Sequence, residues 1–294
     1  MHLHKDEAVV YLPGVGSRGN IVSADDRARL QTVTHLGIGA HPDDVEFMIW
    51  QGILQCYRHP VRHFASLVIT DGKGSSRIGP YADCSDEQIA QIRLGEQHRV
   101  AEAGGYAASI SLGYSSEELR ASAADLVCED IKNVVSCLRP EVIYTHNLAD
   151  RHDSHVAALL RVVQALRELG PDYYPREFYG CEVWRSLDWL AGEDRCVCDV
   201  GANPNLMQTL MGLYDSQISG GKNYAAANFG RRQSNATYSD AYHADDVSLL
   251  ELAMDLRPLL INPSLTPEDY FSELNSRFSL DVRQRLRRMS RDAQ

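Results

Sequence analysis

The chain has 294 residues with an apolar fraction of 44% and a charged fraction of 23%, which indicates a globular protein of one large domain or two small ones. Its 29 basic and 40 acidic residues give a net charge of −11, so a surface for nucleic acid or for an anionic membrane is not expected. The one strongly basic run, residues 283–291, predicts a solvated terminal helix.

Cysteine usage and the apolar pattern indicate the compartment. The seven cysteines are odd in number and form no C-x-x-C pair, which is typical of reduced thiols rather than of a disulfide framework or a zinc finger. No stretch approaches the roughly 18 apolar residues of a membrane span, and the start of the chain lacks the features of a secretory signal. We therefore expect a cytoplasmic protein without a membrane span or a nucleic-acid partner. A homo-oligomer is left open.

The first 32 residues carry turn signals such as Pro13-Gly14 and Gly19-Asn20, and we predict that they lie over the surface as an extension. From residue 33 the hydrophobic pattern alternates between strands and helices. Strands are predicted at 34–40, 64–70, 108–113 and 141–146, and helices at 44–57, 86–105, 117–138 and 153–169. This alternation predicts an α/β fold, a Rossmann-like doubly wound and mostly parallel sheet with helices on both faces, over residues 33–220.

The C-terminal part of the chain is less regular. Beyond residue 176 we predict two short strands, in "EFYGCEVW" and "RCVCDV", and a helix near 203–217. A long glycine- and arginine-bearing loop is predicted at 220–238. Residues 221–294 are expected to complete the same domain as a lid-like region of loop and helices.

Three polar segments follow predicted strands. They are "GAHPDD" (39–44), "TDGKGSSR" (70–77) and "THNLADRHDSH" (145–155). In a doubly wound sheet the ligand crevice lies beyond the carboxyl ends of the strands. All three segments are therefore expected at one edge of the sheet.

Ionisable side chains are concentrated in the first and third of these segments. His41, Asp43 and Asp44 stand at a strand-to-helix turn, where one carboxylate can bind a metal while its neighbour faces the substrate; the alternative is a simple N-cap. His152 and His155 are three residues apart at the entry to a helix and can face one side, although a solvated helix start would also explain them.

Two such segments converging on one site are hard to explain as capping. Two histidines and one aspartate with an open fourth position are a plausible set of catalytic zinc ligands. The remaining carboxylate could take the proton of the water that attacks a carbonyl, and His152 could stabilise the oxyanion or protonate the departing nitrogen. The pattern predicts a zinc-dependent hydrolase of an amide or ester.

The segments "AHPDDVEF" and "DRHDSHVAA" together resemble the PIG-L (LmbE-like) family of zinc-dependent N-deacetylases, over roughly residues 34 to 170. The resemblance implies one Zn²⁺ per chain, held by His41, Asp44 and His155, although another divalent metal would suit these ligands. It also implies Asp43 as the general base and His152 as the electrophilic or acid partner. The implied substrate is a small molecule, a 2-acetamido sugar of the N-acetylglucosamine type or its glycoconjugate.

Other positions match the family less specifically. "VITDGKGSSR" resembles its pocket-lining loop, and "IRLGE" resembles its Arg-x-x-Glu helix, here Arg93 and Glu96. We predict Arg77, Arg93 and Asp150 as substrate-binding residues, with ordinary solvated arginines as the alternative for the first two.

The chain also departs from the family. Ser154 stands where the family usually has an aspartate, and Tyr214-Asp215 stand where a histidine often precedes a Ser-Gln pair. The 220–238 segment carries Lys222, Arg231 and Arg232, which could contact an anionic or large substrate; a solvated loop explains them equally well.

Other functions are weighed against the deacetylase. The same chemistry would serve an amidase of larger acyl or cysteinyl amides. A non-catalytic Rossmann-type module for a nucleotide or sugar is a different class, disfavoured because no G-x-G-x-x-G follows the first predicted strand of the alternating region. A degenerate family member acting as a scaffold is disfavoured by the intact set of ligands.

Overall fold

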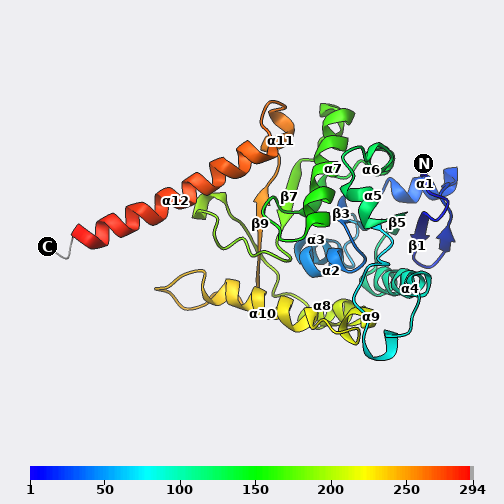
Figure 1. Ribbon diagram of the computed structural model, residues 1–294, viewed down its shortest axis with the longest axis horizontal. Coiled ribbons are helices and arrows are strands. Elements are labelled where there is room, and N and C mark those ends of the chain that lie inside the picture. The colour runs from blue at the N-terminus through cyan, green and yellow to red at the C-terminus, as the bar shows by residue number, and fades with distance from the viewer. Residues whose placement is uncertain (292–294) are drawn as a thin grey trace.

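The computed structural model describes residues 1–291, in which a central nine-stranded sheet lies between two layers of helices (Figure 1). The strand order is β2-β1-β5-β4-β3-β6-β7-β9-β8. The strands are β1 Val9–Leu12, β2 Gly16–Arg18, β3 His35–Gly39, β4 Phe64–Thr70, β5 Ala108–Tyr114, β6 Val142–His146, β7 Glu177–Cys181, β8 Cys196–Asp199 and β9 Leu250–Asp255.

The middle of the sheet is parallel and its flanks are antiparallel. Strands β5, β4, β3, β6 and β7 pair in parallel, whereas β1 and β2 at one end and β9 and β8 at the other pair antiparallel. Every residue of β3, β4 and β6 is buried, as expected of parallel strands covered by helices on both faces. The mostly parallel α/β sheet predicted from the sequence is confirmed.

Helices cover both faces of the sheet and form two apolar cores. One core packs α1, α6, α7 and α11 against the sheet, and the other packs α2, α3, α4 and α8. The helices are α1 Ala24–Leu30, α2 Asp44–Met48, α3 Trp50–Cys56, α4 Asp86–Gly104, α5 Ser116–Arg120, α6 Asp125–Leu138, α7 Asp153–Leu169, α8 Pro204–Gly212, α9 Asp215–Ile218, α10 Tyr224–Thr237, α11 Pro258–Ile261 and α12 Pro267–Arg291.

The first 32 residues are part of the fold, so the prediction of a surface extension was wrong. Strand β1 pairs antiparallel with β5 and forms a hairpin with β2. Val10 and Leu12 alternate with more exposed neighbours and are fully buried, as is Leu30 of α1. Pro13-Gly14, one of the turn signals, lies in the hairpin turn, where Gly14 has a positive φ angle of 75°, and Gly16 begins β2 with a φ angle of 109°.

The single helix predicted at 44–57 is divided into α2 and α3. Ile49 breaks it with φ −125° and ψ 51°. The carboxylate of Glu251 on β9 accepts hydrogen bonds from the backbone N–H groups of Trp50 (2.9 Å) and Gln51 (2.8 Å). These are the free donors at the start of a helix, so a residue 200 positions away in the chain caps α3. The helices predicted at 117–138 and 203–217 are likewise each divided in two.

The loop predicted at 220–238 is mostly the helix α10, and this prediction was also wrong. Three consecutive alanines, residues 225–227, favour the helix. Arg232 then anchors it, because its buried guanidinium pairs with Glu251 and donates a 2.9 Å hydrogen bond to the carbonyl of Phe47. The sequence alone does not show which residues these arginines contact, so it does not predict the helix.

Helix α12 extends away from the body of the molecule (Figure 1). Its residues 283–290 are exposed, which confirms the predicted solvated terminal helix. None of the helices in residues 1–291 combines the length and the apolar character needed to cross a membrane.

We expect Arg232→Ala to lower the free energy of unfolding by about 3 kcal/mol, because Glu251 would remain buried without its cation. The matched control is Arg176→Ala, whose ion pair with Glu177 is exposed and should contribute little. Urea unfolding followed by circular dichroism measures both. Similar losses in the two variants would contradict the assigned importance of the buried pair.

Candidate metal centre

One cavity of about 670 Å³ lies at the carboxyl edge of the parallel strands. The segment after each of the five strands contributes to its lining. These contributions are His41, Asp43 and Asp44 after β3, Gly72, Gly74, Ser75 and Ser76 after β4, Ser116 and Arg120 after β5, His152 and His155 after β6, and Val183 and Trp184 after β7. The remaining wall is formed mainly by α9, α10 and the turn between them. The three polar segments therefore meet at one edge, as the fold rule predicts.

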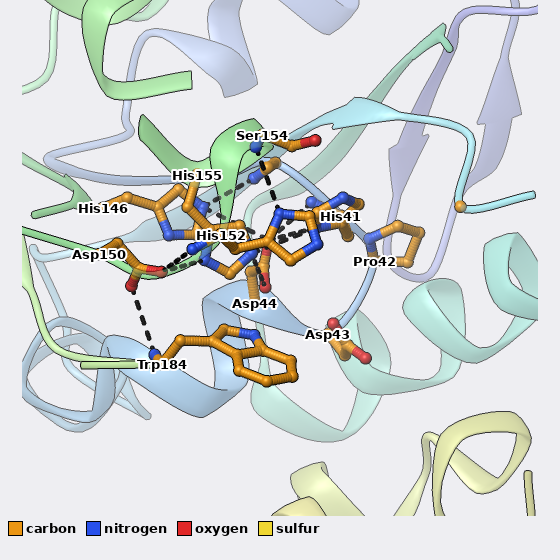
Figure 2. A network of polar contacts seen from close by, with 12 residues as sticks. His41, Pro42, Asp43, Asp44, His146, Asp150, His152, Ser154, His155 and Trp184 are labelled. Carbon is orange, nitrogen blue, oxygen red and sulfur yellow. Dashed lines mark hydrogen bonds and ion pairs between the residues drawn. The ribbon is translucent and has the colours of Figure 1, made fainter. Parts of the chain in front are cut away.

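Three side chains converge on the floor of the cavity. His41 Nδ1 and His155 Nε2 are 3.2 Å apart, Asp44 Oδ2 is 3.3 Å from His41 Nδ1, and Asp44 Oδ1 is 3.3 Å from His155 Nε2. Figure 2 shows the imidazole rings gathered around Asp44, while the carboxylate of Asp43 points elsewhere. The adjacent aspartates thus face different ways.

This donor set fits a zinc ion. A tetrahedral site with metal–ligand distances of about 2.05 Å has edges of about 3.3 Å between ligand atoms. The separations among His41, Asp44 and His155 have that length. Two imidazole nitrogens and one carboxylate also leave a fourth position for water or substrate, as in catalytic zinc sites.

Asp150 lies behind His155 rather than in the cavity. Its Oδ1 is 3.2 Å from His155 Nδ1 and accepts a hydrogen bond from the His152 N–H, and its Oδ2 accepts one from the Trp184 N–H (Figure 2). The Asp150 side chain is fully buried, which does not suit the substrate contact predicted for it. A carboxylate in this position orients the imidazole and selects Nε2 as the nitrogen that binds a metal.

His146, at the end of β6, was not singled out from the sequence. Its Nε2 accepts a hydrogen bond from the Ala40 N–H and lies 3.3 Å from Asp44 Oδ2, and its ring stacks on His155 at 3.9 Å. His146 therefore contacts both Asp44 and His155 and helps to hold the two side chains in position. Its place at the carboxyl end of a parallel strand was the signal that could have identified it.

The site is electrostatically balanced around Asp44. Burial opposes its ionisation, but His155 and His146 outweigh burial and hold the pKa of Asp44 well below its ordinary value. Burial also opposes the cationic form of His155, and the carboxylates of Asp44 and Asp150 outweigh it and raise the pKa of His155 to about 10. The site therefore attracts positive charge, which a bound cation can supply in place of a proton.

Asp43 occupies the N-cap position of α2 but makes no side-chain capping bond, so the capping explanation does not hold. Its φ angle of 97° is unusual for a residue with a side chain, and such strain is common at functional sites. Arg93 Nη2 donates a 3.0 Å hydrogen bond to Asp43 Oδ2. Burial and the neighbouring carboxylates Asp44 and Glu46 raise the pKa of Asp43 well above its ordinary value, although Arg93 opposes the shift.

Arg93 also joins two loops of the site. Its guanidinium donates to the carbonyls of Pro42 and Gly72, and so holds the turn after β3 against the loop after β4. Gly72 is required there because its φ angle is +72° and because a Cβ would come within 2.8 Å of Arg93 Nη1. Arg93, which the sequence predicted to bind substrate, lines the cavity, and its guanidinium there hydrogen-bonds Asp43.

His152 caps α7 and lines the cavity. Its Nδ1 accepts a 3.2 Å hydrogen bond from the Ser154 N–H, so Nε2 carries the proton of the neutral ring. Burial, then His155 and His41, lower the pKa of His152. A neutral imidazole with a free N–H is therefore available beside the three converging side chains.

Other predicted positions lie away from the cavity lining. Arg77 donates hydrogen bonds to the carbonyls of Lys73 and Cys84 and pairs with Asp86, so it holds its own loop together. Ser154 accepts a hydrogen bond from Arg120.

The Ser-Gln pair after Tyr214-Asp215 reaches the site. Glu96 accepts hydrogen bonds from the backbone N–H (2.7 Å) and the hydroxyl (2.6 Å) of Ser216, which fixes α9 on α4. The neighbouring Gln217 lines the cavity, and its Nε2 has no hydrogen-bond partner within residues 1–291. Tyr214 instead donates to the buried Glu46.

One family model matches part of the chain. The PIG-L model, described as GlcNAc-PI de-N-acetylase, matches residues 36–166, which is less than half of the 294 residues. No curated protein sequence matches the chain.

Several solved structures share the fold. The N,N'-diacetylchitobiose deacetylase of Pyrococcus horikoshii is similar over 78% of this chain and 85% of its own, with a TM-score of 0.61 and 14% identity. GalB, the 4-carboxy-2-hydroxymuconate hydratase of Pseudomonas putida KT2440, covers 76% and 96% with a TM-score of 0.59 and 16% identity. The A40926 pseudoaglycone deacetylase Dbv21 covers 76% and 97% with a TM-score of 0.56 and 17% identity. At these identities the likeness establishes the fold alone.

We expect Asp150→Asn to weaken zinc binding by about 10- to 100-fold, because the residue behind a ligating histidine tunes its orientation and basicity. Asp153→Asn, an exposed aspartate three residues along, is the matched control and should leave the affinity unchanged. Competition of the stripped protein with a chromophoric zinc chelator measures both constants. Equal affinities in the two variants would show that Asp150 does not support the metal centre.

Proposed function

We propose that the protein is a zinc-dependent hydrolase that removes the N-acetyl group from a 2-acetamido sugar or its conjugate, because the PIG-L family model matches residues 36–166. The proposal rests chiefly on one observation, the convergence of His41, Asp44 and His155 in a cavity that also presents Asp43 and His152. The family description supports the sugar amide as substrate.

Zinc bound by His41, Asp44 and His155 would polarise the acyl carbonyl and make water more acidic. Asp43 is the group we assign as general base. Its position in the cavity, its raised pKa and its hydrogen bond to Arg93 suit a carboxylate that takes a proton from attacking water. Arg93 is a positioning residue, because it holds both the carboxylate and the backbone of the turn.

We assign His152 as the electrophilic partner. Its Nε2–H can hydrogen-bond the oxygen that becomes negative when water adds to the carbonyl, and the proton that Asp43 took from the water then passes to the departing nitrogen. The C–O bond to water forms first and the C–N bond then breaks, so the products are acetate and a free amine. Asp150 supports this role because it also accepts the backbone N–H of His152.

The cavity wall suits a sugar. Trp184 and Tyr224 line it and meet edge to face at 6.1 Å, offering apolar surface to a ring, and Asn228 and Gln217 offer amides to hydroxyl groups. The Trp184 ring lies 6.0 Å from the His152 ring, which places this wall beside the reacting groups.

The competing assignments can be tested on the same protein. Since the same fold occurs in a hydratase, the fold does not decide the chemistry. An amidase of larger acyl groups would use the same five residues, so the acyl group must be varied as well as the sugar.

Stripped protein should release acetate from N-acetylglucosamine or diacetylchitobiose only after zinc is added, because the three ligands cannot activate the carbonyl without a metal. Acetate is measured by a coupled enzymatic assay, and N-butyryl glucosamine tests for a longer acyl group. Release that is unchanged by stripping the metal would contradict a zinc hydrolase. Zinc-loaded protein that cleaves only the butyryl amide would favour the amidase.

Asp43→Asn should reduce kcat at least about 100-fold while zinc stays bound, because the amide cannot accept the proton of water. Asp71→Asn is the control, since Asp71 follows β4 but does not line the cavity. Zinc content by atomic absorption and kcat on the best sugar are measured together. Full turnover in Asp43→Asn would reject the assigned base.

A further inference from the structure

The cavity is lined by more cationic than anionic side chains, whereas the chain as a whole is acidic. The chain has a net charge of −11, yet Arg120, Lys222 and Arg231 all line the cavity. Among its lining residues within 1–291 the carboxylates are Asp43 and Asp44, both on the floor. Each of these is already paired, Asp43 with Arg93 and Asp44 with histidines.

The three cations of the wall lack such partners. Within the described part of the chain, no ion pair engages Arg120, Lys222 or Arg231. Burial raises the pKa of Glu182, and the charge of Arg231 opposes that shift, but the two side chains form no ion pair. The Glu182 carboxylate instead accepts hydrogen bonds from Asn235 and from the Leu187 N–H. Charge on the wall is therefore available to a ligand.

Lys222 and Arg231 both contact the short segment formed by residues 183 and 184. Lys222 Nζ lies 5.4 Å from the centre of the Trp184 ring, and Arg231 donates a hydrogen bond to the carbonyl of Val183. The Trp184 ring in turn lies 6.0 Å from that of His152. Lys222 and Arg231 thus flank the aromatic wall that adjoins the reacting groups.

The position of Arg231 is held firmly. It lies on α10, which the buried pair of Arg232 and Glu251 fixes to β9. Both cations also lie outside residues 36–166, the part matched to the family. The charge is therefore a feature of this chain's own C-terminal elements.

We propose that the substrate carries an anionic group, a phosphate or a carboxylate, which Lys222 and Arg231 bind beside Trp184. Its amide then lies over His41, Asp44 and His155. The placement of the amide rests on the proposed function, whereas the binding of the anionic group does not. Charged hydrogen bonds of this kind make Lys222 and Arg231 specificity residues, with Arg120 adding to the favourable field.

The test compares matched ligands on zinc-loaded Asp43→Asn protein, by isothermal titration calorimetry. The ligands are N-acetylglucosamine, its 6-phosphate and N-acetylmuramic acid, which are neutral, phosphorylated and carboxylated. We expect an anionic sugar to bind at least about tenfold more tightly than the neutral one, with a preference that falls as salt rises. The stronger of the two anionic ligands identifies phosphate or carboxylate as the group recognised.

Variants then locate the anion site. In the same background, Lys222→Met and Arg231→Met should each reduce the preference for the anionic sugar by about tenfold. Arg231→Lys keeps the charge and should retain part of the preference. Lys73→Met is the control, because Lys73 pairs with Asp71 and does not line the cavity.

The outcomes separate this inference from the proposed function. Equal affinity for neutral and anionic sugars would overturn the anion site, even if wild-type protein released acetate from all of them. A preference that survives Lys222→Met and Arg231→Met would also overturn it. Tight anion binding lost in those variants, without acetate release by wild-type protein, would support the anion site and reject the deacetylase.

Discussion

The structure depends on the position of one buried carboxylate. Asp44 lies within 3.3 Å of a nitrogen of His41, His146 and His155 and accepts a 2.7 Å hydrogen bond from the His41 N–H. A buried anion is unfavourable unless it is paired and hydrogen-bonded. Its partners come from the carboxyl ends of β3 and β6 and from α7, so satisfying this charge requires the parallel sheet and the helix after β6 to meet at one edge.

Around this centre, a second set of contacts holds each reacting group from behind. Asp150 supports His155, and Arg93 supports Asp43 and joins the turn after β3 to the loop after β4. None of these contacts requires substrate. The site is therefore organised in advance, which is the condition under which fixed charges stabilise a transition state most effectively.

The C-terminal elements complete the cavity and add basic and aromatic side chains to its wall. Two buried carboxylates attach them to the domain, since Glu96 holds α9 through Ser216 and Glu251 holds α10 through Arg232. The floor of the cavity is thus built from the segment matched to the family, whereas most of the opposite wall, with Tyr224, Lys222 and Arg231, is built from residues beyond it. Under the proposals made above, reaction type and substrate choice would accordingly be divided between two parts of the chain.

The sequence by itself determined the central strands, the helices at 86–105 and 153–169, and the segments that meet at the site, because hydrophobic period and topology are local or general properties. It did not reveal that residues 1–32 add strands to the sheet, that most of 220–238 is a helix, or that His146 and Asp150 contact the proposed ligands. Those features depend on partners far away in the chain, such as Glu251 for α3 and α10. Only the tertiary structure decides them, because a charged side chain can be buried only where the fold supplies a partner of opposite charge.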